Sequence, residues 1–201
     1  MKEKVSINIS ARHVHLTKEN IDKLFGHPLH VKRMLNQVGQ YAAKEVVTIK
    51  NGDKKIENVR VIGPERKYNQ VEISACDARM LEIKPPVRKS GNLDGAEMIT
   101  IETDKGSVMG NFAIIAERHV HFSPSDALKY GVEDEELLKL EIGGIKTGEV
   151  EVHAKVSNDG FYEAHLDIDD ANAFLITPGD IGVLKKWVFI LEMLKLMDKL
   201  L

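Results

Sequence analysis

The sequence predicts a mainly β protein, built of two small β-barrels capped by short α-helices and related by an internal pseudo-repeat. Three observations carry this prediction. Short β-like runs broken by glycine turns fill most of the 201 residues, which is typical of small barrels. Helical patterns are few and short. The tetrapeptide Arg-His-Val-His occurs at residues 12–15 and again at 118–121, followed each time by a short predicted helix.

The first half begins with a strand, because residues 4–10 (KVSINIS) alternate apolar and polar side chains. Thr17 can cap the short helix TKENIDKLFG, with Gly26 near its end. Asn51-Gly52 is a hairpin signal between two further runs. The β-like runs of this half are residues 45–52, 56–64, 70–74 and 97–106.

The second half repeats the order. Ser123 is the matching helix cap, Pro124 takes the first helical position, and Gly131 ends the helix. Asp159-Gly160 is another hairpin signal. The β-like runs of this half are residues 137–144, 148–160 and 162–168.

The last residues, 187–201, are largely apolar, but Glu192, Lys195 and Lys199 recur at helical spacing. They predict a C-terminal amphipathic helix. The segment is too short and too charged for a membrane span.

Composition narrows the class of protein. The formal net charge of −3 gives no global attraction for nucleic acid or an acidic membrane. The single cysteine, Cys76, excludes an internal disulfide and fits a reducing compartment; we expect it to be a buried, inert thiol. The chain has neither a Walker loop nor a GxGxxG motif, so nothing argues for ATP or NAD.

The repeated tetrapeptide supplies two His-x-His pairs, His13 with His15 and His119 with His121. Histidines two apart on a strand point the same way, and two neutral imidazoles can chelate one zinc ion. The alternative is that both copies are inherited turn-and-cap features without metal.

A candidate third ligand for each pair comes from aligning the two halves of the chain beyond the tetrapeptide. VEISACDA (71–78) aligns with AHLDIDDA (164–171), which places Glu72 on His165. Each half then offers an open three-ligand set, as catalytic zinc sites do. Taken alone, Glu72 would be a solvated strand glutamate.

Several basic residues are candidates for binding an anion. Arg66 suits a phosphate, which guanidinium can grip through two oxygens; the alternative is a surface loop. Arg88 and Ser90 form a second candidate phosphate contact or a plain loop. Arg12 and Arg118 are expected on the strand face opposite the histidines, where they brace the site or contact an anionic ligand.

Six stretches together resemble one family: SARHVHLT, GQYAAKEVVTI, GPERKYNQVEIS, PPVRKSG, RHVHFSPSDA and EAHLDIDDANA. They resemble the PduL-type phosphate acyltransferases, also called phosphate propanoyltransferases or phosphotransacylases, over roughly residues 5–175. The resemblance implies reversible conversion of an acyl-CoA and phosphate into an acyl phosphate and coenzyme A.

The resemblance also implies how the chain divides. Residues 1–11 together with 117–186 would form one β-barrel, and residues 12–116 the other. The amphipathic tail, 187–201, lies outside the resemblance.

The family's site implies two metal ions, usually zinc, in a cleft between the barrels, with coenzyme A as a substrate. Its motifs assign three ligands to each ion: His13, His15 and Glu72 to one, and His119, His121 and His165 to the other. Arg66 matches the family's phosphate-site arginine.

The chain departs from its relatives in places. Many carry arginine where Ala75 stands. Microcompartment members usually have an N-terminal targeting extension, whereas this chain starts almost at its first strand, which favours the cytoplasm. We expect a homodimer, no nucleic acid, and a tail that docks on a barrel, a dimer partner, a shell or a membrane surface.

The favoured function is therefore a zinc-dependent phosphate acyltransferase acting on a short-chain acyl-CoA, acetyl or propanoyl. Direct transfer between sulfur and phosphate needs no side-chain nucleophile. A dizinc hydrolase of thioesters or phosphoesters would use the same ligands with water instead of phosphate. A third reading is a non-enzymatic barrel module whose metals are structural.

Overall fold

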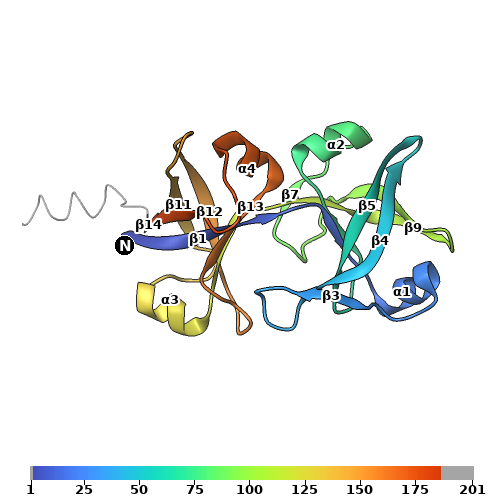
Figure 1. The fold of residues 1–201 in the computed structure, drawn as a ribbon, viewed down its shortest axis with the longest axis horizontal. Coiled ribbons are helices and arrows are strands. Elements are labelled where there is room, and N and C mark those ends of the chain that lie inside the picture. The colour runs from blue at the N-terminus through green and yellow to red at the C-terminus, as the bar shows by residue number, and fades with distance from the viewer. Residues whose placement is uncertain (1, 187–201) are drawn as a thin grey trace, which may run out of the picture.

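The computed structural model describes residues 2–186, so the helix predicted for 187–201 lies outside the described residues. The described chain contains strands β1–β14 and helices α1–α4. They form two closed barrels that lie side by side along the long axis of the molecule (Figure 1). The prediction of a mainly β fold with two small barrels is confirmed.

Barrel one closes in the order β1-β13-β10-β12-β11-β14. Its strands are β1 (Lys2–Ser10), β10 (His119–Phe122), β11 (Leu137–Ile142), β12 (Gly148–Val156), β13 (Glu163–Asp167) and β14 (Ile181–Lys186). Its helices are α3 (Pro124–Tyr130) and α4 (Ile168–Phe174).

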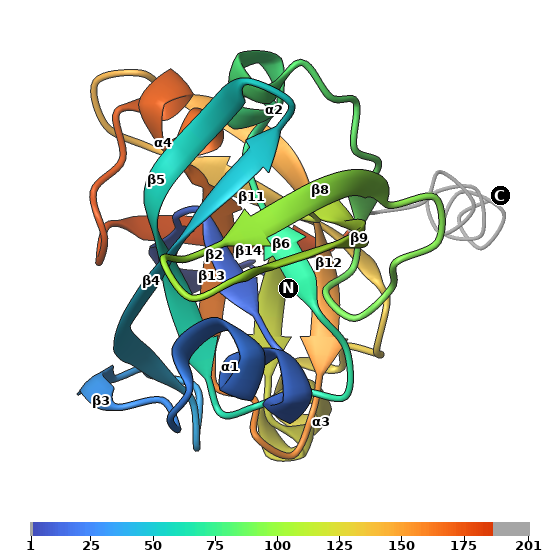
Figure 2. The same cartoon turned by 90° about the vertical axis from the view of Figure 1, so that its right-hand side faces the viewer.

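Barrel two follows the order β4-β5-β2-β6-β9 and closes because β8 pairs with both β9 and β4. Its strands are β2 (His13–His15), β4 (Tyr41–Asn51), β5 (Lys54–Gly63), β6 (Gln70–Glu72), β8 (Glu97–Glu102) and β9 (Ser107–Ala116). Two short strands extend the sheet, β3 (Val31–Met34) beside β4 and β7 (Val87–Arg88) beside β9. Its helices are α1 (Lys18–Phe25) and α2 (Ala75–Leu81). Figure 2 views the molecule from this end.

The two barrels have the same topology with one pair of strands exchanged. In barrel two, β2 is antiparallel to β6 and parallel to β5. In barrel one, β10 is antiparallel to β13 and parallel to β12. Strand β1 belongs to barrel one but leads into β2 of barrel two, whereas β9 belongs to barrel two but leads into β10 of barrel one. Each half of the pseudo-repeat therefore lends its first strand to the other half's barrel.

Each barrel buries its own apolar core. Leu24, Ile49 and Ile101 are fully buried in barrel two, and Phe122 and Leu140 in barrel one. Burying each such side chain contributes about 1.5–3 kcal/mol. Strand β11 alternates half-buried and buried residues, as the period of a strand requires.

The predicted caps and the first hairpin are confirmed. The side chains of Thr17 and Ser123 accept hydrogen bonds from backbone N–H groups of the first turns of α1 and α3. Gly26 and Gly131 end these helices in the left-handed region, at φ 71° and 63°, which glycine adopts without strain. Residue Asn51 begins the turn between β4 and β5. Among residues 2–186, none of the helices combines the length and apolarity needed to cross a membrane.

The hairpin predicted at Asp159-Gly160 is wrong. A turn is present, since the Gly160 N–H donates to Ser157 O at 2.9 Å, but β12 and β13 do not pair because β10 lies between them. A Cβ on Gly160 would lie 2.1 Å from the carbonyl oxygen of Phe122. The glycine is thus required by a close backbone approach rather than by a hairpin.

The expectation that Cys76 is buried is also wrong, because the thiol is exposed. Cys76 lies in the first turn of α2, and its backbone N–H donates to Asp169 Oδ2 of α4 at 2.8 Å. This contact joins the two barrels. Ala78 and Leu81 of α2 pack into the core of barrel two, and this packing leaves Cys76 on the exposed side of the helix.

Candidate active site in the cleft between the barrels

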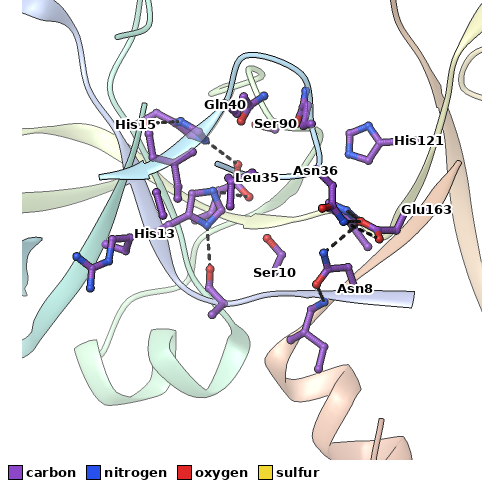
Figure 3. Close-up of a pocket in the computed structure, with 18 of the residues that line it drawn as sticks. Asn8, Ser10, His13, His15, Leu35, Asn36, Gln40, Ser90, His121 and Glu163 are labelled. Carbon is purple, nitrogen blue, oxygen red and sulfur yellow. Dashed lines mark hydrogen bonds and ion pairs between the residues drawn. The ribbon is translucent and has the colours of Figure 1, made fainter. Parts of the chain in front are cut away.

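A cleft of about 630 Å³ lies between the barrels and is lined by residues of both. Figure 3 shows His13 and His15 on one side of it and His121 and Glu163 on the other. All six predicted metal ligands line this cleft: His13, His15, Glu72, His119, His121 and His165. The structure also places Arg66, Ser90 and Arg12 in its wall.

The first group is held by the pairing of β2 with β6, which sets His13 opposite Glu72. The Nε2 atoms of His13 and His15 lie 3.5 Å and 3.9 Å from the Glu72 carboxylate oxygens. The Nδ1 atoms hydrogen-bond to the backbone oxygens of Ala11, at 2.9 Å, and Ile62, at 3.2 Å. Since a carbonyl only accepts, each ring carries a proton on Nδ1, and the Nε2 that faces Glu72 is the nitrogen that can bind an ion or a second proton.

The charges in this group favour a cation. Glu72 is buried; burial alone would raise its pKa, but the neighbouring His13 holds the pKa well below its usual range. Burial lowers the pKa of His15 to about 3, so this ring is neutral at pH 7. Burial opposes a charge on His13, yet the Glu72 carboxylate raises its pKa overall. An anionic oxygen and imidazole lone pairs form a ligand set suited to zinc.

The second group lies on barrel one, where the register pairs His119 with His165. The Nε2 atoms of His119 and His121 are 3.1 Å apart, and the His119 Nδ1 donates to Glu117 O at 2.8 Å. Burial lowers the pKa of His119 to about 3 and that of His121 to about 2. Two uncharged rings thus bring nitrogen atoms together in a buried place, which a cation between them would stabilise.

The ligand atoms of each group lie within 4.8 Å of one another. The third members, Glu72 and His165, occupy equivalent positions in the two barrels, as the alignment of the halves predicts. Within residues 2–186, the buried Nδ1 of His121 has no hydrogen-bond partner. The residues present therefore fit a metal ion in each group.

Sequence reasoning missed the polar residues that hold the third members. Gln70 Nε2 donates to Glu72 Oε1 at 2.6 Å and to Ser90 Oγ at 2.8 Å. On the other barrel, Glu163 Oε2 lies 3.0 Å from His165 Nε2. Gln70 and Glu163 each stand two residues before the third member, on the same strand face. Both residues directly precede the aligned stretches 71–78 and 164–171, so an alignment extended by one residue would have paired them.

Glu163 also connects the barrels. It accepts hydrogen bonds from Asn8 of β1 at 3.1 Å and from Asn36, in the loop between β3 and β4, at 3.1 Å (Figure 3). In the same loop Gln37 donates to Asp159 at 2.8 Å. The sequence contains no signal for this loop, because its partners lie more than a hundred residues away.

Two of the cationic side chains that line the cleft, Arg66 and Lys155, suit an anionic ligand. The Nε of Arg66 is buried and has no hydrogen-bond partner within the described residues, so an anion in the cleft would satisfy it. Lys155 lies opposite His121 in the β10–β12 pairing, and burial lowers its pKa. Sequence reasoning did not single out Lys155, since only the strand pairing brings it beside the histidines.

The other predicted arginines have partners outside the cleft. Arg12 pairs with Asp77 of α2, at 2.6 Å and 2.9 Å, and Arg118 pairs with Asp170 of α4, at 2.7 Å and 2.8 Å. Each ties the start of a His-x-His strand to the first turn of a helix. Arg88 does not line the cleft, and its guanidinium donates to Asp94 O and Val87 O of its own loop.

Comparison with known proteins identifies the family of this chain. The model of the phosphate propanoyltransferase family matches residues 6–177. Its relatives include several proteins named phosphate propanoyltransferase. The protein from Thermotoga maritima is 44% identical over 88% of this chain and 87% of its own length. That from Lachnoclostridium phytofermentans is 40% identical over 88% and 85%, and that from Salmonella typhimurium is 40% identical over 84% and 82%. This chain therefore belongs to the phosphate propanoyltransferase family.

Proposed function

We propose that this chain interconverts a short-chain acyl-CoA and phosphate with an acyl phosphate and coenzyme A, at a site that holds two zinc ions. The observation that carries the proposal is the pair of three-ligand groups facing one cleft, which also contains the buried Arg66 Nε that has no hydrogen-bond partner within the described residues. Family membership supports the acyltransferase class. The relatives' name supports propanoyl-CoA as one substrate, and acetyl-CoA is the other that we propose.

The residues have distinct roles in this proposal. Two sets of ligands hold the metals: His13, His15 and Glu72, and His119, His121 and His165. Zinc in such a site polarises a thioester carbonyl and stabilises a thiolate leaving group. Because Glu72 carries a negative charge that His165 lacks, the two sites differ in net charge.

Arg66 binds the phosphate. Its free Nε–H and terminal N–H groups donate to phosphate oxygens, and guanidinium matches them through two parallel hydrogen bonds. Lys155, on the opposite barrel, is another cationic side chain that lines the same cleft. Ser90, held by Gln70, offers a hydroxyl beside the Glu72 group. Phosphate itself is the nucleophile, so no covalent enzyme intermediate is required.

The test is release of coenzyme A from acetyl-CoA, propanoyl-CoA and butanoyl-CoA, measured with and without phosphate and before and after chelation. The transferase requires phosphate, forms acyl phosphate, and loses activity with its metal. Release of free acid without phosphate would instead support a dizinc thioester hydrolase. Metal content without either activity would support a structural role, for which zinc usually has four protein ligands.

Other expectations remain proposals. Strand pairing supports the division into a barrel of residues 1–11 with 117–186 and a barrel of residues 12–116. The homodimer, the cytoplasmic location and the docking of residues 187–201 stay predictions.

A further inference from the structure

A third group of ligating side chains lies outside the cleft. His27 and His30 stand in the segment between α1 and β3, and Glu45 stands on β4. Their candidate ligand atoms lie within 4.8 Å of one another, and none of the three residues lines the cleft. Helix α1 lies at the end of the molecule away from barrel one (Figure 1).

The distances suit a metal ion. His30 Nδ1 lies 2.7 Å and His27 Nδ1 lies 3.9 Å from the same Glu45 oxygen, Oε1. Ligands bound tetrahedrally at about 2.1 Å from zinc are about 3.4 Å from one another. The two observed separations lie on either side of that value, so small side-chain rotations would complete the geometry. The two rings are already adjacent, with centroids 5.0 Å apart.

The backbone holds the three residues in place. Gly26 ends α1, and its N–H donates to Asp22 O at 2.9 Å. At the other end of the segment, Lys44 N–H donates to His30 O at 2.8 Å. Glu45 also accepts the backbone N–H of His30 at 3.0 Å. The segment that carries His27 and His30 is therefore held at one end by the end of α1 and at the other by the hydrogen bonds between His30 and β4.

The exposure of the three side chains suits a metal site that is open to solvent on one side. The side chain of Glu45 is only 8% exposed, whereas those of His27 and His30 are 43% and 60% exposed. A buried carboxylate at the base is paired with two rings that solvent can reach. An ion could enter from solvent and keep water at its remaining position.

We propose that His27, His30 and Glu45 form a third metal site, which takes a divalent transition ion of the zinc class. Two imidazoles and one carboxylate suit zinc, nickel or copper better than magnesium or calcium, which prefer all-oxygen ligands. In the ion-free state, His30 Nδ1 hydrogen-bonds Glu45, and His27 Nδ1 donates to Pro28 O at 2.8 Å. In the bound state each neutral ring carries its proton on Nε2 and offers Nδ1 to the ion. The site does not depend on the proposed catalytic activity.

The experiment measures zinc per chain after the full chain is dialysed against buffered free Zn²⁺. The double variant His27→Gln with His30→Gln should bind about one ion fewer than the original chain, with its acyltransferase activity unchanged. Glu45→Gln should lose the same ion. Glu19→Gln is the matched control, because Glu19 is an exposed carboxylate of α1 outside the cluster; it should keep the full zinc content.

A crystal soaked in Zn²⁺ provides the direct readout. Anomalous difference density between His27, His30 and Glu45, absent from the double variant, supports the site. Equal zinc content in the original chain and the double variant overturns the proposal. Anomalous density confined to the cleft also overturns the proposal, whether or not both cleft groups are fully occupied by zinc. Because the double variant changes only half-exposed or exposed side chains, it is suited to the comparison if Glu45→Gln does not fold.

Discussion

At the scale of single residues, the cleft depends on which imidazole nitrogen is free. Backbone oxygens of Ala11, Ile62 and Glu117 fix the Nδ1 atoms of His13, His15 and His119. The Nε2 atoms of His13 and His15 then face the Glu72 carboxylate, and that of His119 faces His121. Such backbone contacts orient ligands before any ion arrives, which lowers the cost of binding.

Glu72→Gln should remove the negative charge of the first group while keeping its shape. We expect about one zinc ion fewer per chain and a loss of activity of more than about 100-fold, since loss of even a supporting contact commonly costs 10–100-fold. In the metal-free protein the pKa of His13 should fall, because Glu72 is what raises it. Zinc analysis and NMR titration of His13 check these outcomes; an unchanged His13 pKa would contradict the assigned contact.

The buried histidines should make the metal-free protein sensitive to acid. Their pKa values in the folded state are about 3 for His15 and His119 and about 2 for His121, against about 6.5 when unfolded. Below pH 6.5 the unfolded chain therefore binds more protons than the folded chain. The contribution to stability is complete above pH 6.5 and is lost as pH falls toward 3, at up to about 1.4 kcal/mol per pH unit for each ring.

Urea unfolding of the chelated protein from pH 7 to pH 5 measures this slope. A free energy of unfolding that stays level over this range would contradict the prediction.

At the scale of elements, two arginine–aspartate pairs attach the histidine strands to helices. Asp77 of α2 is nearly inaccessible and also takes part in the capping box with Ser74. Asp170 of α4 pairs with Arg118 as Asp77 pairs with Arg12. Sequence reasoning left open whether these arginines brace the site or contact a ligand, and the pairs with aspartate in both halves favour bracing.

Arg12→Ala should destabilise the protein by about 1–3 kcal/mol, because it leaves the buried Asp77 carboxylate without its partner. The cost is below that of a fully buried pair, since the Arg12 side chain is 40% exposed. Lys18→Ala is the control: its pair with Asp22 is exposed on both sides, so its loss should cost less than about 0.5 kcal/mol. Denaturant unfolding measures both, and equal effects would contradict the bracing role.

At the scale of the whole molecule, the exchange of β1 and β9 makes the barrels interdependent. Neither barrel closes without a strand that continues directly into the other, and the cleft lies between them. Contacts through Glu163 and Asn36 join the two sides again. The relative position of the two ligand groups is therefore built into the chain connectivity.

Leu140→Ala should test this coupling. Leu140 is fully buried in barrel one, so the cavity should cost about 2–5 kcal/mol. If the barrels unfold together, hydrogen exchange at Val61, in the core of barrel two, should accelerate as well. Leu128→Ala, at a side chain 85% exposed, should change neither. Faster exchange confined to barrel one would show that the barrels unfold separately.

Much of the architecture could be predicted because its signals are local. Strand alternation, the caps at Thr17 and Ser123, and the glycines that end α1 and α3 each depend on a few neighbouring residues. The repeat then paired Glu72 with His165 by alignment alone. The hairpin at Asp159-Gly160 failed for the opposite reason, since whether two strands pair depends on β10, which lies far away in the sequence.

The sequence by itself determined the six candidate ligands, the duplicated plan and the family resemblance, because these reside in residue identity and spacing. Only the tertiary structure decided that Lys155, Gln70 and Glu163 join the two groups at the cleft and that Arg88 does not. The reason is that strand order and register are set by long-range packing of the two cores. Local patterns place a side chain on a strand face, but the neighbouring strand decides what that side chain meets.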